Sequence, residues 1–209
     1  MGHPSPPGTG RAVRRNPVSA VGEMAMAVSM TGGRGAVARA IVDEARLAPG
    51  DRAVDIGCGP GTAARIAAAR GVPVTGVDPS SIALRLARVL GRGARAARIT
   101  WMPGTAEHLP LADGAVTVAW SISSVHHWAD QAAGCAEMHR VLAPGGRVLL
   151  AERLVSDGAT GFAAHGSTVG QAEQLCRTLG AAGFTDVSSR TMRAGRRMRI
   201  VISATRPSA

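Results

Sequence analysis

Short runs of mainly apolar residues recur along the chain from residue 52 onward, and longer segments with helical periodicity separate them. Runs of four to eight such residues are typical of strands buried on both faces of a parallel sheet. The pattern therefore predicts alternating strands and helices. The expected parallel strands are 53–56, 73–77, 98–102, 115–121 and 147–154.

Helix boundaries can be read from the residues between these strands. Val37, Ile41 and Ala45 recur at helical spacing before Pro49-Gly50, and Ser80 or Ser81 can cap the helix that follows the second strand. Three further helices are expected. They are an alanine-rich one ending near Gly71, one carrying Cys135, Met138 and Leu142, and one carrying Leu175, Cys176 and Leu179.

The chain ends in two extended segments, 184–190 and 197–206, separated by a loop that contains Gly195. Such a pair predicts an antiparallel hairpin. We therefore expect an α/β fold: a Rossmann-like, doubly wound sheet that is mostly parallel, with one antiparallel strand near the C-terminus.

The 209 residues, 45% of them hydrophobic, suit one domain with an appendage. Residues 31–209 are expected to form the domain, and residues 1–30 a mobile arm whose Met-rich part, Met24 to Met30, is a candidate lid. No apolar run is long enough for membrane insertion. Three widely spaced cysteines form no C-x-x-C pair, which favours a reducing cytoplasm over a disulfide framework.

A formal net charge of +10 raises the question of nucleic-acid binding. All 24 basic residues are arginine in a chain rich in alanine and glycine, so compositional bias explains much of this charge. The chain has no tyrosine and only five other aromatic residues, too few for a platform that stacks bases. Nucleic acid is therefore not expected as the partner.

The segment 54–62, VDIGCGPGT, runs from a strand through a glycine turn into a helix. Its spacing is G-x-G-x-G, whereas a dinucleotide fingerprint would place a third glycine where this chain has Thr62. Asp55, two positions before the first glycine, is placed to hold an amino group over the turn. A cofactor with a cationic amino-acid tail would suit this turn.

A second carboxylate, Asp78, ends the next strand, 21 positions after Gly57. This is the expected place for a group that accepts hydrogen bonds from both ribose hydroxyls. Two negative charges around one turn would repel a pyrophosphate. They suit S-adenosylmethionine better.

With these residues in place, the sequence resembles the class I S-adenosylmethionine-dependent methyltransferases. Five blocks carry the resemblance, in the family's order, from Val54 to Leu150: VDIGCGPGT, VTGVDPS, GTAEHLPLADGAVTVAWS, SSVHHW and RVLAPGGRVLL. The similarity is greatest to the small-molecule branch that includes the ubiquinone and menaquinone biosynthesis methyltransferases. It implies a seven-stranded sheet whose last two strands form the hairpin.

The resemblance also implies a set of cofactor contacts. Gly57, Gly59 and Gly61 would line the methionine end, Asp78 the ribose, and Ala106 with Glu107 the adenine. Thr105 stands where the branch usually has aspartate, and Val116-Thr117 where Phe-Asp is common; both changes are expected to weaken cofactor binding. The remaining cofactor-site candidates are Cys58, for which packing is the favoured role, Pro79 and Ser121.

His126 and His127 follow the fourth strand, at the edge where open parallel sheets bind ligands. A neutral imidazole, with a reference pKa of about 6.5, can take a proton from an acceptor, so either histidine is a candidate general base. Shaping of the pocket wall is the simpler interpretation, because the pair is common in this branch. His108 and His139 lack partners at metal-ligand spacing, and no metal is expected.

The leading functional hypothesis is in-line methyl transfer from S-adenosylmethionine to a small-molecule acceptor, with S-adenosylhomocysteine as product. One alternative is a protein of the same fold that has lost catalysis, suggested by Thr105 and Thr117. A less favoured alternative is an RNA methyltransferase. The chain lacks an evident appended RNA-binding domain and the Asn/Asp-Pro-Pro-aromatic signature of base-amine methyltransferases.

Overall fold

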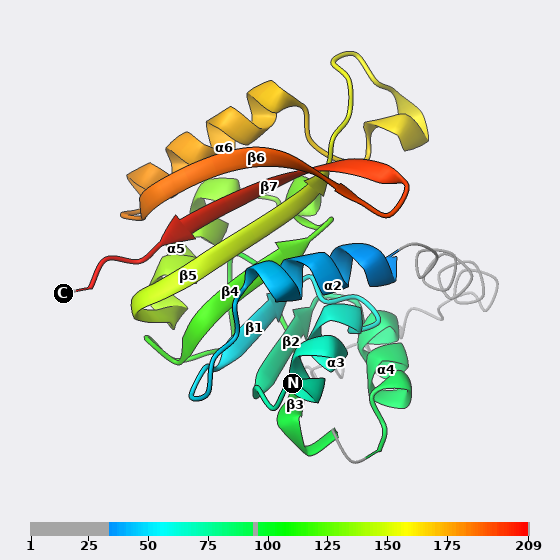
Figure 1. The fold of residues 1–209 in the computed structure, drawn as a ribbon, viewed down its shortest axis with the longest axis vertical. Coiled ribbons are helices and arrows are strands. Elements are labelled where there is room, and N and C mark those ends of the chain that lie inside the picture. Colours follow the sequence, from blue (N-terminus) through cyan, green and yellow to red (C-terminus); the bar gives the residue numbers. More distant parts are fainter. Residues whose placement is uncertain (1–33, 94–95, 209) are drawn as a thin grey trace, which may run out of the picture.

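Seven strands form one mixed sheet in the order β3-β2-β1-β4-β5-β7-β6 (Figure 1). The computed structural model describes residues 34–93 and 96–208. All neighbouring strands are parallel except β7, which is antiparallel to both β5 and β6. The predicted doubly wound sheet with one antiparallel strand is confirmed.

The elements follow one another along the chain much as the apolar pattern predicts. Their bounds are α2 (Arg34–Glu44), β1 (Ala53–Ile56), α3 (Thr62–Ala69), β2 (Val74–Asp78), α4 (Ser81–Leu90), η1 (Ala96–Arg98), β3 (Ile99–Pro103), β4 (Val116–Ile122), η2 (Val125–His127), α5 (Gln131–Val141), β5 (Leu142–Arg153), η3 (Gly161–Ala164), α6 (Val169–Ala181), β6 (Thr185–Ala194) and β7 (Arg197–Thr205).

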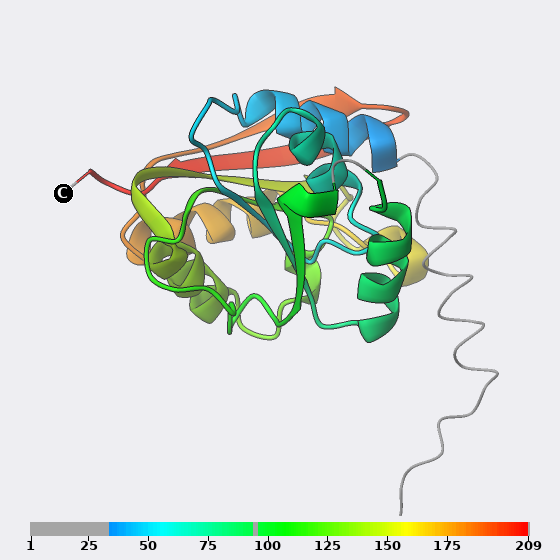
Figure 2. The same ribbon diagram turned by 90° about the horizontal axis from the view of Figure 1, so that it is seen from below.

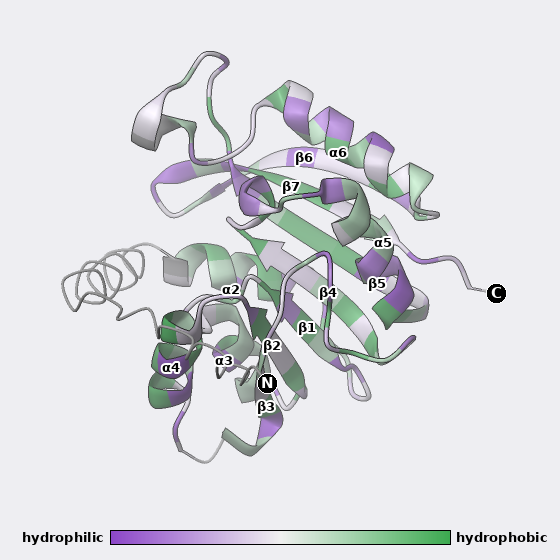
Figure 3. Cartoon of the chain, turned by 180° about the vertical axis from the view of Figure 1, so that it is seen from behind, coloured by the Kyte–Doolittle hydropathy of each residue, from purple (hydrophilic) through white to green (hydrophobic). Residues whose placement is uncertain are grey.

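Helices cover both faces of the sheet, which is why the central strands read as apolar runs. Helices α2 and α3 lie on one face and α5 and α6 on the other, while α4 packs against β2 and β3 at the edge (Figure 2). All four residues of β1 are buried. The middle strands are accordingly mostly hydrophobic along their length, whereas α6 alternates between polar and apolar positions (Figure 3).

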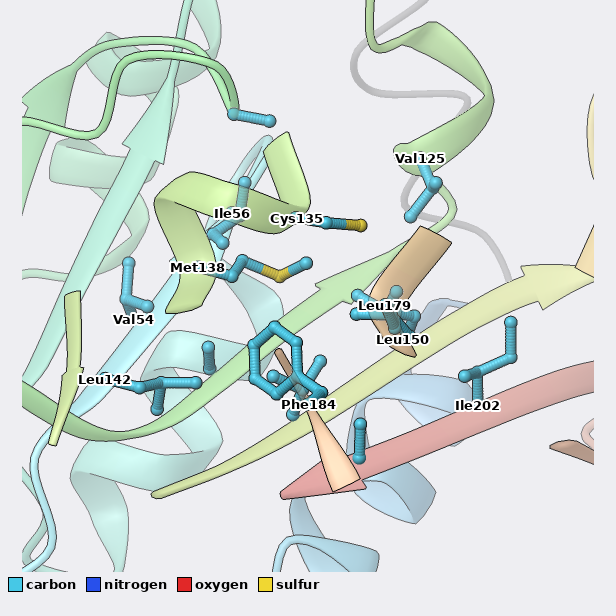
Figure 4. Packing of buried hydrophobic residues seen from close by; sticks show 14 of the residues in the cluster. Val54, Ile56, Val125, Cys135, Met138, Leu142, Leu150, Leu179, Phe184 and Ile202 are labelled. Carbon is cyan, nitrogen blue, oxygen red and sulfur yellow. The ribbon is translucent and has the colours of Figure 1, made fainter. Parts of the chain in front are cut away.

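Each face has its own apolar core. Under α2 and α3, fully buried Trp120 packs with Ile41 and the small residues of α3. Under α5 and α6, Met138 and Phe184 gather over the strands with Leu150 and Ile202 (Figure 4). At about 25 cal/mol per Å² of buried apolar area, these two layers provide the main stabilisation that holds the carboxyl edge of the sheet in place.

Two strand boundaries differ from the prediction by several residues, and one of them is the end of β6, at Ala194 rather than residue 190. Strand β5 begins at Leu142 rather than near residue 147, and Leu142 therefore belongs to the strand rather than to the preceding helix. It pairs with Val116 before a register shift, which accommodates the Pro144-Gly145-Gly146 turn within the same element. The interpretation of residues 1–30 as an arm or lid lies outside the described residues.

None of the helices in residues 34–93 and 96–208 has the length and apolar character that a membrane crossing requires. The longest of them, α6, has 13 residues. It ends at Ala181, with three residues between it and β6, and its N-terminus is closed by a capping box between Thr168 and Gln171.

Candidate active site

The candidate site lies at the carboxyl edge of β1, β2 and β4. Ile56, the last residue of β1, pairs with Val77 on one side and Ser121 on the other. Strand order reverses here, because β2 and β3 lie on one side of β1 and the later strands on the other. Ligands of doubly wound sheets bind in the crevice at such a switch point.

The glycine turn crosses this edge in a conformation that only glycine adopts readily. Gly57, Gly59 and Gly61 have φ angles of +68°, +52° and +73°. A Cβ on Gly57 would lie 1.9 Å from Ser124 Oγ, and one on Gly61 would lie 2.1 Å from Trp101 Cη2. Both the backbone angle and the space therefore require glycine.

Asp78 holds this turn through both carboxylate oxygens. Oδ2 accepts a hydrogen bond of 2.8 Å from the Gly59 amide, and Oδ1 accepts one of 2.8 Å from the Ser80 amide. The side chain is thus fixed at the end of β2, and each oxygen keeps a second lone pair. Pro79, which follows, is exposed at the same edge.

Asp55 is directed into the protein rather than across the turn. The residue is 3% exposed, and its Oδ2 accepts a 3.1 Å hydrogen bond from the Ala64 amide in the first turn of α3. Burial raises the pKa of this carboxyl from 3.8 to about 7, although the Ala64 amide opposes the shift. That Asp55 holds the amino group of a cofactor stays a prediction.

The raised pKa of Asp55 has a consequence for stability. Between about pH 4 and pH 7 the folded protein retains a proton that the unfolded chain has lost, so ionisation of Asp55 lowers the free energy of unfolding as the pH rises. We expect Asp55→Asn to melt at a higher temperature than the parent protein. The gain in melting temperature should be small near pH 4, grow up to about pH 7 and then level off. Each kcal/mol of added stability corresponds to roughly 2–4 °C. Differential scanning calorimetry across this range checks it, and a gain that does not depend on pH would contradict it.

The loop after β3 places Thr105, Ala106 and Glu107 together. Glu107 Oε1 accepts hydrogen bonds from the amides of Ala129 and Asp130, at 2.8 and 3.2 Å. Partial burial raises the pKa of Glu107, but these amides, its own amide and the Thr105 hydroxyl together lower it below its ordinary value. Thr105 therefore supports an ionised Glu107, and Ala106 is buried beside it.

Two further candidates lie in the interior of this edge. The Ser121 hydroxyl is completely buried and has no hydrogen-bond partner among the described residues. The Cys58 thiol is also buried, and desolvation, with the nearby Asp55 and Asp78, raises its pKa well above the ordinary value. Cys58 is therefore unsuited to act as a thiolate, which agrees with the favoured packing role.

His126 is half-buried and pairs with the buried Glu152, a contact that the sequence did not predict. His126 Nδ1 lies 2.7 Å from Glu152 Oε2, and Oε1 of the same carboxylate accepts hydrogen bonds from the Ser124 and Val125 amides, at 2.9 and 2.8 Å. Glu152 is 3% exposed near the end of β5. The signal available in the sequence was an acidic residue directly after the apolar residues 148–151 of the predicted strand.

The expectation that Thr117 affects the cofactor site is wrong. Thr117 lies at the amino end of β4, where its hydroxyl donates a 2.6 Å hydrogen bond to Asp51 Oδ1. Arg147 binds the other oxygen of Asp51 at 2.6 Å. Thr117 therefore stabilises the edge of the sheet opposite the glycine turn.

A cavity of about 360 Å³ lies beyond the end of β5, and one of its lining residues, Arg153, directly follows Glu152 in the sequence. Its lining combines two arginines with apolar and small residues. The residues are Arg153, Leu154, Val155, Ser156, Ala159, Arg197 and Met198. It lies beside the segment after β5 rather than at the glycine turn.

This architecture is that of the class I methyltransferase fold. A putative methyltransferase from Haloferax volcanii, solved with the Trm112 activator, superposes with a TM-score of 0.75 at 17% identity, over 92% of this chain and 99% of that one. Residues 54–150 match the methyltransferase domain family.

Curated relatives match about half of this chain. The 27-O-demethylrifamycin SV methyltransferase of Amycolatopsis mediterranei is 35% identical over 127 residues, 59% of this chain and 46% of that protein. The ubiquinone/menaquinone biosynthesis C-methyltransferase of Geotalea daltonii is 35% identical over 121 residues, 54% of this chain and 50% of that protein. The chain spans about half the length of these relatives.

The residues at this edge fit S-adenosylmethionine. The glycine turn leaves a surface that a Cβ would fill, and Asp78 offers two fixed acceptor oxygens to a ribose diol. Ser121 supplies a buried hydroxyl without a partner among the described residues. The negative charges of Asp78 and Glu107 favour a ligand that carries positive charge.

Proposed function

We propose that this chain transfers a methyl group from S-adenosylmethionine to a small-molecule acceptor. The observation that carries the proposal is the attachment of Asp78 to the glycine turn at the switch point of the sheet. S-adenosylmethionine supplies a methyl group on a positively charged sulfur, which an acceptor attacks in line to leave S-adenosylhomocysteine.

Each part of the edge has a separate task in binding. Asp78 would accept the ribose hydroxyls, and Ala106 with Glu107 would lie at the adenine end. Gly57, Gly59 and Gly61 allow the backbone to approach the methionine end, with Asp55 beneath the turn. Holding the reactants in line lowers the activation barrier of a displacement reaction by about 7–11 kcal/mol in favourable cases.

His126 is the better candidate for the general base. An ionised Glu152 can only accept, so the hydrogen bond between them places the His126 proton on Nδ1 and leaves Nε2 as the proton acceptor. Glu152 acts as a positioning residue, because the Ser124 and Val125 amides hold it in turn. His127 lies beside His126, with 3.9 Å between ring centroids, and would form the pocket wall.

The acceptor is proposed to enter from the side of β5. The relatives include a methyltransferase named for an O-demethylated substrate and a C-methyltransferase, which supports a small molecule with a hydroxyl or carbon nucleophile. The cavity beyond β5 supplies apolar contacts from Leu154, Val155 and Met198, and positive charge from Arg153 and Arg197. This lining favours an apolar acceptor that carries an acidic or phenolic group.

Release of S-adenosylhomocysteine tests this function. The purified chain should release it with at least one member of a panel of phenols, quinols and hydroxylated polyketides, at a rate above that without acceptor. An Asp78→Asn variant should lose that release. Absence of release across the panel, from a protein that binds the cofactor, would contradict the proposal and favour a binding protein of the same fold.

We also propose that the protein works in a reducing cytoplasm. Cys58, Cys135 and Cys176 are all free, and the first two are buried. Free buried thiols are expected where disulfides do not form.

A further inference from the structure

Three histidines from two separate segments lie close together, and one of them is the candidate base His126. His126 and His127 belong to η2, and His165 follows η3 in the segment between β5 and α6. The His165 ring centroid lies 5.8 Å from that of His126 and 5.7 Å from that of His127. One ligand nitrogen from each ring lies within 4.8 Å of the other two. We refer to these three residues as the histidine cluster.

We propose that the histidine cluster binds one divalent transition-metal ion, with zinc as the best-suited ion. Neutral imidazoles are preferred zinc ligands, and three of them leave a fourth, open position, the arrangement of catalytic rather than structural zinc sites. The sequence analysis expected no metal, because His165 lies 38 positions from His127 (165 minus 127) and no spacing rule joins them.

Glu152 provides an independent reason to regard this cluster as a metal site. Histidines that bind metals almost always hydrogen-bond through their other ring nitrogen to a carboxylate or carbonyl, which fixes the ring and its tautomer. Glu152 makes this contact with His126 Nδ1 and is itself held by two amides. His126 Nε2 is therefore the nitrogen available to an ion, and a bound ion would occupy the lone pair that the base role requires, so the two roles of Nε2 exclude each other.

The distances allow closure around an ion with side-chain movement only. Tetrahedral zinc with bonds of about 2.0–2.1 Å separates its nitrogen ligands by about 3.3 Å. The cluster nitrogens lie within 4.8 Å of one another, so each separation has to shorten by at most about 1.5 Å. His127 and His165 are exposed, whereas Glu152 holds the ring of His126.

The backbone that carries His165 is held next to the sheet. Val155 donates to Ser167 at 3.1 Å, and Ser167 donates to Arg153 at 2.9 Å. These two hydrogen bonds join the two ends of the loop after β5, and Ser167 lies two residues from His165. They thereby hold His165 near η2. A bound ion would therefore join this loop to η2 beside the cavity beyond β5.

Calorimetric titration of the full chain, without an affinity tag, with zinc chloride tests the site. We expect one ion per chain, and His165→Ala should weaken binding at least about tenfold. Glu152→Gln should weaken it about 10–100-fold, the usual effect of removing an outer-shell carboxylate. His108→Ala is the matched control, since His108 is an exposed histidine outside the cluster, and it should bind zinc like the parent chain.

Thermal melting separates loss of the site from loss of the fold. Zinc should raise the melting temperature of the parent chain and of His108→Ala, but not that of His165→Ala, while all three should melt alike with chelator. Absence of one-to-one binding, or an equal loss in His108→Ala and His165→Ala, would overturn the proposal. The site does not depend on the proposed methyl transfer, because zinc binding is measured without cofactor or acceptor.

Discussion

Gly57→Ala should abolish cofactor binding and destabilise the domain by about 2–4 kcal/mol. Two effects add. Alanine is strained at a φ of +68°, and its Cβ would lie 1.9 Å from Ser124 Oγ and 2.6 Å from Ser124 Cβ. The turn must shift to relieve this overlap, which moves the backbone that the cofactor is proposed to contact. Chemical denaturation and titration with S-adenosylhomocysteine measure the two losses.

Two variants separate the effects. Gly71 has a similar φ of +89° with no atom near its Cβ position, so Gly71→Ala should show the backbone strain alone and keep cofactor affinity. Adding Ser124→Gly to Gly57→Ala removes both clashing atoms and should restore part of the stability. If Gly57→Ala binds cofactor like Gly71→Ala, the glycine turn does not form the cofactor site.

His126→Ala should reduce methyl transfer about 10²–10⁴-fold, the usual contribution of a general base. The measurement is the turnover number with the acceptor that releases most S-adenosylhomocysteine in the panel. Cofactor affinity should stay within about threefold, because Asp78, Glu107 and the glycine turn do not contact His126. His127→Ala should have a smaller effect, since its predicted role is in the pocket wall.

A positioning role for Glu152 predicts a distinct pattern. Glu152→Gln keeps a side-chain oxygen for the backbone amides but no longer favours the Nδ1-protonated ring of His126. Turnover should fall less than in His126→Ala, and the two changes together should cost no more than His126→Ala alone. Full turnover in His126→Ala would show that the histidine pair only shapes the pocket.

Much of the fold could be predicted because its signals are local. Buried parallel strands appear as apolar runs, Ser80 caps α4 as expected, and Gly195 marks the hairpin turn. The start of β5 was missed because Leu142 satisfies the periodicity of α5 as well as the pairing with Val116. Only the partner strand decides between them.

The site was predictable only where residues are close in the sequence. The glycine turn and Asp78 follow from spacing along consecutive strands, but the orientation of the Asp55 carboxylate depends on α3. Thr117 was expected to weaken cofactor binding because it departs from a family pattern, but it lies at the start of β4, away from the glycine turn, where its hydroxyl binds Asp51. Glu152 and His165 reach His126 only through the folded sheet and the loop after β5.

Titration of the purified chain with S-adenosylhomocysteine is the most direct test of a cofactor site at the switch point, with Asp78→Asn and Asp113→Asn alongside. Asp113 is an exposed acid before β4 and serves as the control. We expect one-to-one binding that Asp78→Asn weakens about 10–100-fold, as loss of a charged acceptor of the ribose hydroxyls should, and that Asp113→Asn leaves unchanged. No binding by the parent chain, or equal binding by all three proteins, would contradict the assignment of this edge as the cofactor site.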